Sequence, residues 1–133
     1  MRRALMLLAF VFTALRAVAP LRAHHNTAGI YDAARPVPLN GTVTAVQWRN
    51  PHVFIFVDSK DEAGTVVNWK VEALGALTVL RDGLTKDSLR VGDQINMTAC
   101  LAKDGSHNAA VQFVFVPSAF ENHRFGDCKA VSR

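Results

Sequence analysis

A single helical pattern interrupts a chain that otherwise has β-strand character, and its position constrains the fold most strongly. Leu74 to Leu80 (LGALTVL) places leucines at helical spacing. Five other segments carry strand-like apolar patterns: 39–48, 52–58, 65–72, 94–101 and 109–116. Three strands, one helix and two strands is the order of the OB fold, a partly open Greek-key barrel. The sequence therefore predicts a mainly β, OB-like five-stranded Greek-key barrel with one short helix between strands 3 and 4; a small open sandwich is the alternative.

Two of these strand patterns predict which side chains face the core. Val67, Trp69 and Val71 alternate with polar residues, so we expect them to point inward together. The segment 52–58 (HVFIFVD) contains five consecutive large apolar residues. A continuous apolar run is typical of a strand that is buried on both faces, which is what we expect of this segment.

The first 23 residues have the pattern of a secretory signal peptide. Arg2 and Arg3 precede the apolar run Ala4 to Leu15, which is shorter than the roughly 20 residues that span a bilayer. We expect cleavage after Ala23, because a cut after Ala19 would leave proline as the first residue. The alternative is a buried N-terminal helix. Cleavage predicts a periplasmic or secreted protein that keeps no membrane anchor.

Removal of residues 1–23 changes the charge of the chain. Four of the 15 Lys and Arg residues lie in that segment, which has no acidic residue, so 11 basic and 11 acidic residues are left. A nucleic-acid partner needs a basic surface, and this balance argues against one. The remaining chain suits one domain. We divide it into an N-terminal extension (24–38), the OB-like barrel (39–117) and an irregular C-terminal tail (118–133).

Several motifs together resemble a known bacterial family. They are the "AHH" that follows the apolar segment, then "LNGTVTAVQWRNPHVFIFVD", "VVNWKVE" and "LTKDSLRVGDQI". In these motifs the sequence resembles the exported proteins of the domain of unknown function 6152 family, over about residues 23–116. The resemblance implies export and a single β domain, and it assigns no reaction.

Two cysteines, Cys100 and Cys128, fit an oxidising compartment. A disulfide between them would stabilise the fold by roughly 3–4 kcal/mol on the chain-entropy model. Two unpaired thiols are the alternative, because sequence alone gives no distance between the two sulfur atoms.

Three histidines are candidate metal ligands. After cleavage His24 would carry the free α-amine beside its own imidazole, and His25 would add a second imidazole. Nitrogen-rich sites favour Cu(II) among the common divalent ions. His52, fixed by Pro51 at the start of a strand, is the expected third ligand. The alternatives are a solvated chain end for His24 and His25, and a structural His52 bonded to a backbone carbonyl or to Asn50.

Trp48 and Trp69 are candidates for a ligand face, because OB folds stack sugars or bases on exposed aromatic rings. Packing in the core is the other interpretation, and the large apolar area of tryptophan favours it. No nucleophile motif or pair of catalytic acids indicates an enzyme. The sequence therefore predicts a small exported protein that binds Cu(II); a non-metal module that binds a carbohydrate or a protein partner is the alternative.

Overall fold

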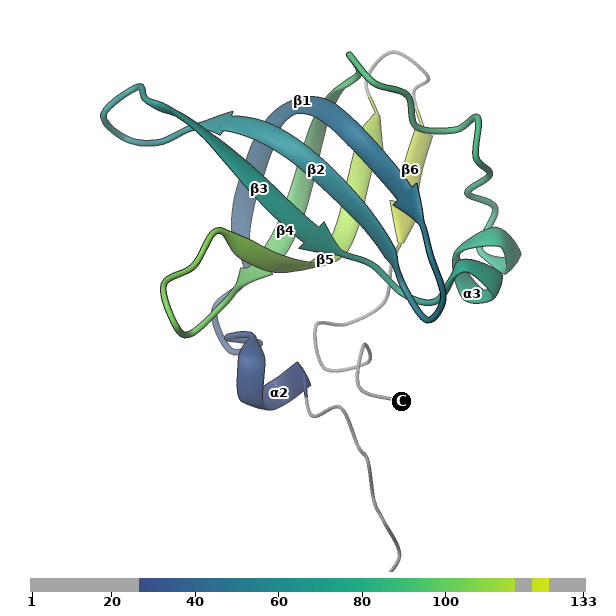
Figure 1. The fold of residues 1–133 in the computed structure, drawn as a ribbon, viewed down its shortest axis with the longest axis horizontal. Helices are drawn as coiled ribbons and strands as arrows, with labels where there is room; N and C mark the ends of the chain where they lie inside the picture. The colour runs from purple at the N-terminus through teal and green to yellow at the C-terminus, as the bar shows by residue number, and fades with distance from the viewer. Residues whose placement is uncertain (1–26, 117–120, 125–133) are drawn as a thin grey trace, which may run out of the picture.

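The computed structural model describes residues 27–116 and 121–124, and Figure 1 shows their arrangement around a barrel. The signal peptide prediction, His24, His25 and Cys128 lie outside these residues. The helices and strands are α2 (Thr27–Ile30), β1 (Val37–Trp48), β2 (Val53–Lys60), β3 (Val66–Glu72), α3 (Ala76–Arg81), β4 (Gln94–Leu101), β5 (Asn108–Val116) and β6 (Glu121–Arg124). No helix within the described residues is long and apolar enough to cross a bilayer.

The first five strands close into a barrel. Strand β1 pairs antiparallel with both β2 and β4, while β2 pairs with β3 and β4 pairs with β5. A short parallel ladder between β3 and β5, from Lys70 with Asn108 to Glu72 with Ala110, joins the two ends of the sheet. The predicted OB-like barrel is confirmed, with its short helix between β3 and β4 (Figure 1).

A sixth strand lies where the sequence predicts only an irregular tail. Residues Glu121–Arg124 pair antiparallel with Phe113–Val116 of β5. Strand β3 uses only the beginning of β5, so the later part of that edge is open to another strand. Backbone pairing satisfies the N–H and C=O groups of such an edge without an apolar sequence pattern, and for that reason the polar segment gave no strand signal.

The core lies inside the barrel, and β2 shows how it is built. Val53, Ile55 and Val57 are fully buried. Phe54 and Phe56 lie on the outer face and are only partly buried. The prediction that segment 52–58 is buried on both faces is therefore wrong for the outer face. Helix α3 adds the buried Val79 to the same core, and Leu84 and Leu89 of the following loop extend it.

The segment before β1 is fixed to the outside of the barrel. Tyr31 forms an isolated bridge with Ala102, and two flanking backbone bonds of 2.9 Å join Asp32 N–H to the Leu101 carbonyl and Lys103 N–H to the Ile30 carbonyl. Tyr31 packs with the buried Cys100 in a second small cluster. The expected extension 24–38 is thus docked against the barrel from α2 onward, and its last two residues belong to β1.

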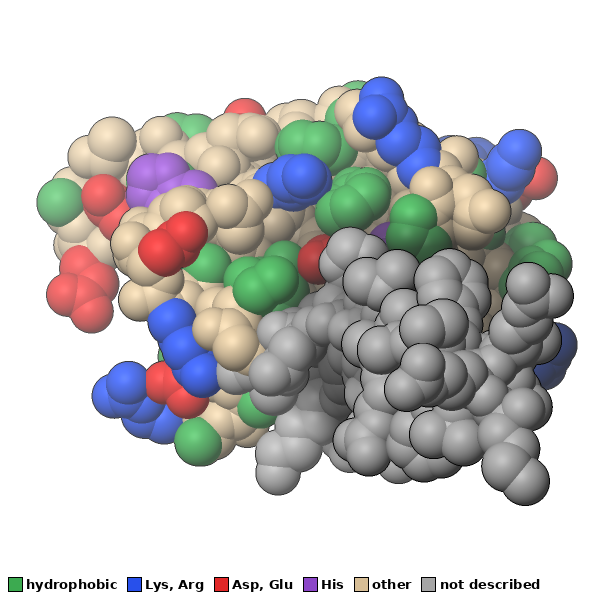
Figure 2. Space-filling model, turned by 60° about the horizontal axis from the view of Figure 1, so that its bottom comes forward, with side chains coloured by type: hydrophobic (Ala, Val, Ile, Leu, Met, Phe, Trp, Pro, Cys, Tyr) green, Lys and Arg blue, Asp and Glu red, His purple; other side chains and the backbone are tan. Residues whose placement is uncertain are grey.

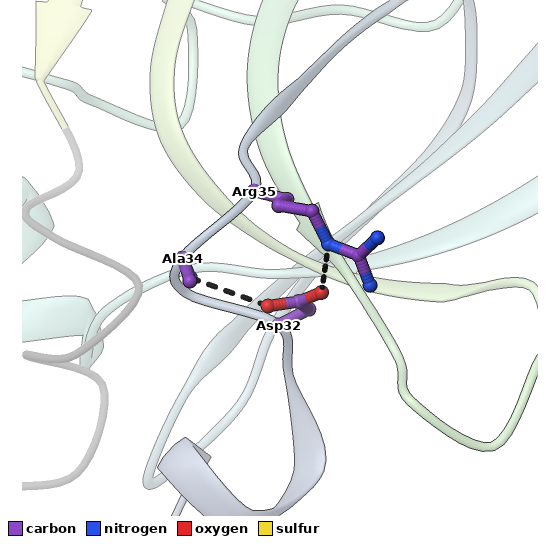
Figure 3. A network of polar contacts seen from close by, with 3 residues as sticks. All are labelled: Asp32, Ala34 and Arg35. Atoms are coloured by element: carbon purple, nitrogen blue, oxygen red, sulfur yellow. Dashed lines mark hydrogen bonds and ion pairs between the residues drawn. The ribbon is translucent and has the colours of Figure 1, made fainter.

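A polar turn leads from this docked segment into β1 (Figure 3). The Asp32 carboxylate accepts hydrogen bonds from Arg35 Nε–H at 2.8 Å and from Ala34 N–H at 3.3 Å. The bond from the Arg35 side chain lowers the pKa of the exposed Asp32 carboxyl. This turn redirects the backbone directly after Tyr31, which stays against the barrel.

Candidate functional site

Three polar side chains meet on the outer face of the barrel. Tyr31 Oη–H donates to Glu72 Oε2 at 2.7 Å, and His52 Nδ1–H donates to the other carboxylate oxygen, Oε1. The side chains of His52 and Glu72 are 19% and 16% exposed. One carboxylate therefore joins a histidine and a tyrosine in a partly desolvated position. We call these three residues the Tyr31–Glu72–His52 site.

Strand register brings these residues together. Phe54 of β2 is opposite Glu72, the last residue of β3. His52 lies two residues before Phe54 and so projects from the same face, diagonally across from Glu72. Tyr31 reaches the carboxylate from the docked N-terminal segment. Three separate parts of the chain thus contribute one side chain each.

Tyr31 is 5% exposed, and this burial raises the pKa of its phenol well above the usual value. The hydrogen bond to Glu72 and the negative charge of that carboxylate raise the pKa further, because a phenolate would lose the bond and face the charge. At neutral pH Tyr31 is a neutral donor that holds Glu72 in place.

We expect Tyr31 to make stability fall at alkaline pH. A phenol whose pKa is raised by folding contributes stability fully below about pH 10, its unfolded value, and loses it as pH rises toward the folded value. The chain has a single tyrosine, so tyrosinate absorbance reports on this residue alone. In urea the titration should be centred near pH 10. In the folded protein it should begin at distinctly higher pH, and coincident curves would contradict the buried bond to Glu72.

The free ring nitrogen of His52 is available for a further bond. Within the described residues no hydrogen bond engages Nε2. A histidine that donates one N–H to a carboxylate presents its other nitrogen in a fixed direction, which is a common feature of metal ligands. Among the described residues, no three His, Cys, Asp or Glu side chains come close enough together to hold a metal ion. A metal ion on His52 would therefore need further ligands from outside the described residues.

The structure places the other sequence-predicted residues as follows. Among the described residues the His52 imidazole is bonded to the Glu72 carboxylate, and not to Asn50 or to a backbone carbonyl, the partners expected for a structural histidine. His24 and His25 lie outside the described residues. Cys100 is fully buried, and the proposed disulfide stays a prediction because Cys128 is also outside them.

The two tryptophans are both partly buried and pack against the core. Trp48 is opposite Val53 and Trp69 is opposite Val57, four residues further along β2. Trp69 also contacts the ring of His107, with centroids 5.2 Å apart. The structure therefore sets the tryptophans at separate points along β2, and their role as a ligand face stays a prediction.

Sequence reasoning missed Tyr31 and Glu72 as site residues. Glu72 was visible only as part of the polar face of its strand, and Tyr31 as one residue of a short polar extension. The signal that could have found Glu72 is its position at the end of a strand expected to pair with the strand that follows His52. No comparable signal exists for Tyr31.

The comparisons with known proteins identify the family. No curated protein and no solved structure matches the sequence. The family model described as "Family of unknown function (DUF6152)" matches residues 13–111, which covers the docked segment, β1 to β4 and the beginning of β5. The chain belongs to this family.

Proposed function

We propose that this protein is exported and binds one Cu(II) ion on the outer face of its barrel. The ligands are Nε2 of His52 and the α-amine and imidazoles of a mature N-terminus that begins at His24. The observation that carries the proposal is the hydrogen bond from His52 Nδ1–H to Glu72, which leaves Nε2 as the free ring nitrogen. Glu72 is itself held by Tyr31, so the imidazole is oriented before any metal arrives.

The docked segment limits the distance between the proposed N-terminus and Tyr31. His25 lies six residues before Tyr31, so its Cα lies within about 20 Å of the Tyr31 Cα even if the chain is fully extended. Residues Thr27–Ile30 form α2, which shortens that reach because a helix rises only about 1.5 Å per residue. Tyr31 contacts the same carboxylate as His52. The short tether therefore limits how far the proposed N-terminus can lie from the Tyr31–Glu72–His52 site, which supports its assignment as a ligand.

The donor set favours copper. An α-amine and several imidazoles form a nitrogen-rich site, and Cu(II) binds such sites most tightly among the common divalent ions. The amine and imidazoles must lose protons to bind, so affinity should fall below about pH 6. Secretion is part of this proposal, because cleavage after Ala23 is what creates an α-amine on His24.

Isothermal titration with Cu(II) tests the proposal on residues 24–133. Protein recovered from the periplasm should first show an N-terminal sequence that begins His-His-Asn. One residue added before His24 should weaken binding sharply, because the amine then leaves the histidine. His52→Ala should weaken it less and leave the fold intact. Glu72→Gln should lower affinity about 10–100-fold, the usual effect of removing a partner that orients a ligand.

His107→Ala is the matched control for these variants. His107 is exposed and its ring contacts Trp69, which projects from the opposite face of β3 to Glu72, so its loss should leave the Cu(II) affinity unchanged. Equal affinity for the extended and the native N-terminus would contradict the site. So would an unchanged affinity in the His52→Ala protein.

A polar groove gives the non-metal alternative a physical location. It is shallow, about 600 Å³ in volume, and lies where β1 is flanked by β2 and β4. Its lining is rich in amides and hydroxyls: Asn40, Thr42, Thr44, Gln94 and Asn96. Such groups suit the hydroxyls of a carbohydrate. An oligosaccharide that binds equally with and without chelator would support this second function over the copper site.

A further inference from the structure

Helix α3 exposes its large apolar side chains. Leu77 is 78% exposed and Leu80 is 45% exposed, whereas Val79 faces the core and is 2% exposed. Leu77 and Leu80 are three residues apart, and Arg81 follows at the next position, so all three project from one side of the helix. A two-turn helix that buries a valine and exposes two leucines needs a physical explanation.

The exposed leucines border a groove with a distinct chemistry. Trp48 and Pro51, from the end of β1 and the turn that follows, line this groove together with Leu77 and Leu80. The charged residues that line this groove, Arg49 and Lys86, are both cationic. On the side of the molecule where α3 lies, Figure 2 shows apolar side chains at the surface near Lys and Arg side chains. We call Trp48, Arg49, Leu77, Leu80 and Lys86 the α3 patch.

Among the described residues, the other exposed large apolar side chains, Ile30, Val66 and Val91, do not line this groove. Val66, which is 57% exposed, lies at the start of β3 and borders the polar groove described above. Scattered exposed valines are normal in folded proteins, whereas leucines grouped with a tryptophan and cations mark an interaction surface. The grouping at α3 is therefore the feature to explain.

We propose that the α3 patch docks the protein onto the surface of an anionic phospholipid bilayer. Leucines that project from a short helix can enter the boundary between headgroups and acyl chains. Tryptophan favours that same interface, and Arg49 and Lys86 complement the negative headgroups. Leu77, which is 78% exposed, projects out of this groove toward solvent, and such a side chain fits insertion into a lipid interface better than contact with a peptide lying in the groove. The docking is peripheral and requires no metal ion.

Cosedimentation of residues 24–133 with vesicles tests this proposal, with chelator present to remove any effect of metal. These residues contain every helix and strand that the structure describes. Vesicles of phosphatidylcholine that also contain phosphatidylglycerol should bind the protein, and binding should weaken as salt screens the charges. Pure phosphatidylcholine vesicles should bind it at least several-fold more weakly.

Substitutions in the patch give the decisive comparison. Leu77→Ser combined with Leu80→Ser should weaken vesicle binding roughly tenfold or more, because the protein loses the two leucine side chains that enter the bilayer. Arg49→Gln and Lys86→Gln should each weaken it roughly fivefold on anionic vesicles. All four side chains are at least partly exposed, and circular dichroism checks that the fold is intact.

Val66→Ser is the matched control, because it removes an exposed apolar side chain from the far hairpin between β2 and β3 (Figure 1). It should bind vesicles like the unmodified protein. Failure of the unmodified protein to bind anionic vesicles would overturn the proposal. The proposal would also be overturned if Val66→Ser weakened vesicle binding as much as the double leucine variant does, or if the double leucine variant bound vesicles as well as the unmodified protein. Binding to an acidic peptide without vesicle binding would assign the patch to a protein partner instead.

Discussion

Replacement of Gly41 by alanine should destabilise the barrel by about 3 kcal/mol or more. A Cβ at this position would lie 2.2 Å from the Asp58 carbonyl oxygen and 2.8 Å from Val57 Cγ1. The closer contact is with backbone, which cannot turn away as a flexible side chain can. Gly41 is also paired with Ile95 of β4. Strand β1 is thus held between two neighbours, and it can relieve the clash only by disturbing one of its ladders.

Urea unfolding of the Gly41→Ala protein measures this effect, and Gly64→Ala is its control. Gly64 lies in the hairpin between β2 and β3 with φ +82°, and a Cβ there meets nothing within 4 Å. Its substitution should cost only the penalty of a left-handed backbone for alanine, about 1–2 kcal/mol. If Gly41→Ala lowers the free energy of unfolding no more than Gly64→Ala does, β1 and β2 can separate freely at this point.

The importance of Gly41 could not be read from the sequence. A glycine within a strand pattern indicates a bulge, a bend or a close approach of another backbone, and the sequence does not say which. The structure shows that the backbone of Asp58 approaches Gly41 closely. A shift in the β1–β2 register lies a few residues further along β1, between Val43 and Ala45. The distinction depends on which strands flank β1, and that is a property of the closed barrel.

The order of the five barrel strands and helix α3, in contrast, was accessible from sequence. Alternating residues such as Ile95 and Met97 predict β4 with its observed bounds, because one strand face is buried and the other is solvated. Once five strands and the helix are in order, the OB-like topology follows. The spacing of apolar residues along the chain is enough to predict the type and order of these elements, because it reflects which side chains are buried.

Strand β2 shows where a local pattern misleads. Its run of apolar residues predicts burial on both faces, but Phe54 and Phe56 lie partly exposed on the outer face. Lys70 from β3 covers Phe54, with its ammonium nitrogen 4.5 Å from the ring centroid. A long charged side chain can thus shield an aromatic ring without a second layer of structure. Sequence alone cannot distinguish this cover from a true second core.

The candidate site was predictable only in part. His52 was identified because proline and a strand start frame it, and in the structure it lies directly before β2, which begins at Val53. Its bond to Glu72 joins residues 20 apart in the chain, and the Tyr31 bond to Glu72 joins residues 41 apart. Such contacts are decided by strand register and by the docking of the N-terminal segment. Neither the strand register nor this docking can be read from the apolar and polar pattern around each residue.

The second large effect is expected at Ile55, in the middle of β2. Its side chain is fully buried and lies opposite Val46 of β1 and Val71 of β3. Ile55→Ala removes three carbons from the closed interior, where neighbouring strands are paired on both sides and cannot collapse into the cavity. The free energy of unfolding should fall by about 2–5 kcal/mol, measured as a lower urea midpoint with an unchanged slope.

Trp69→Ala provides the comparison that tests where the core lies. Trp69 has the larger side chain, but it is only partly buried and shares its contacts between the core and the exposed ring of His107. The loss of unfolding free energy on truncation grows with the buried apolar area removed and with the cavity left behind. Trp69→Ala should therefore lower the free energy of unfolding less than Ile55→Ala does, although it removes more atoms. The reverse order would place the centre of the core at β3 near Trp69, and the inward tryptophan that the sequence predicts would then be the main support of the barrel.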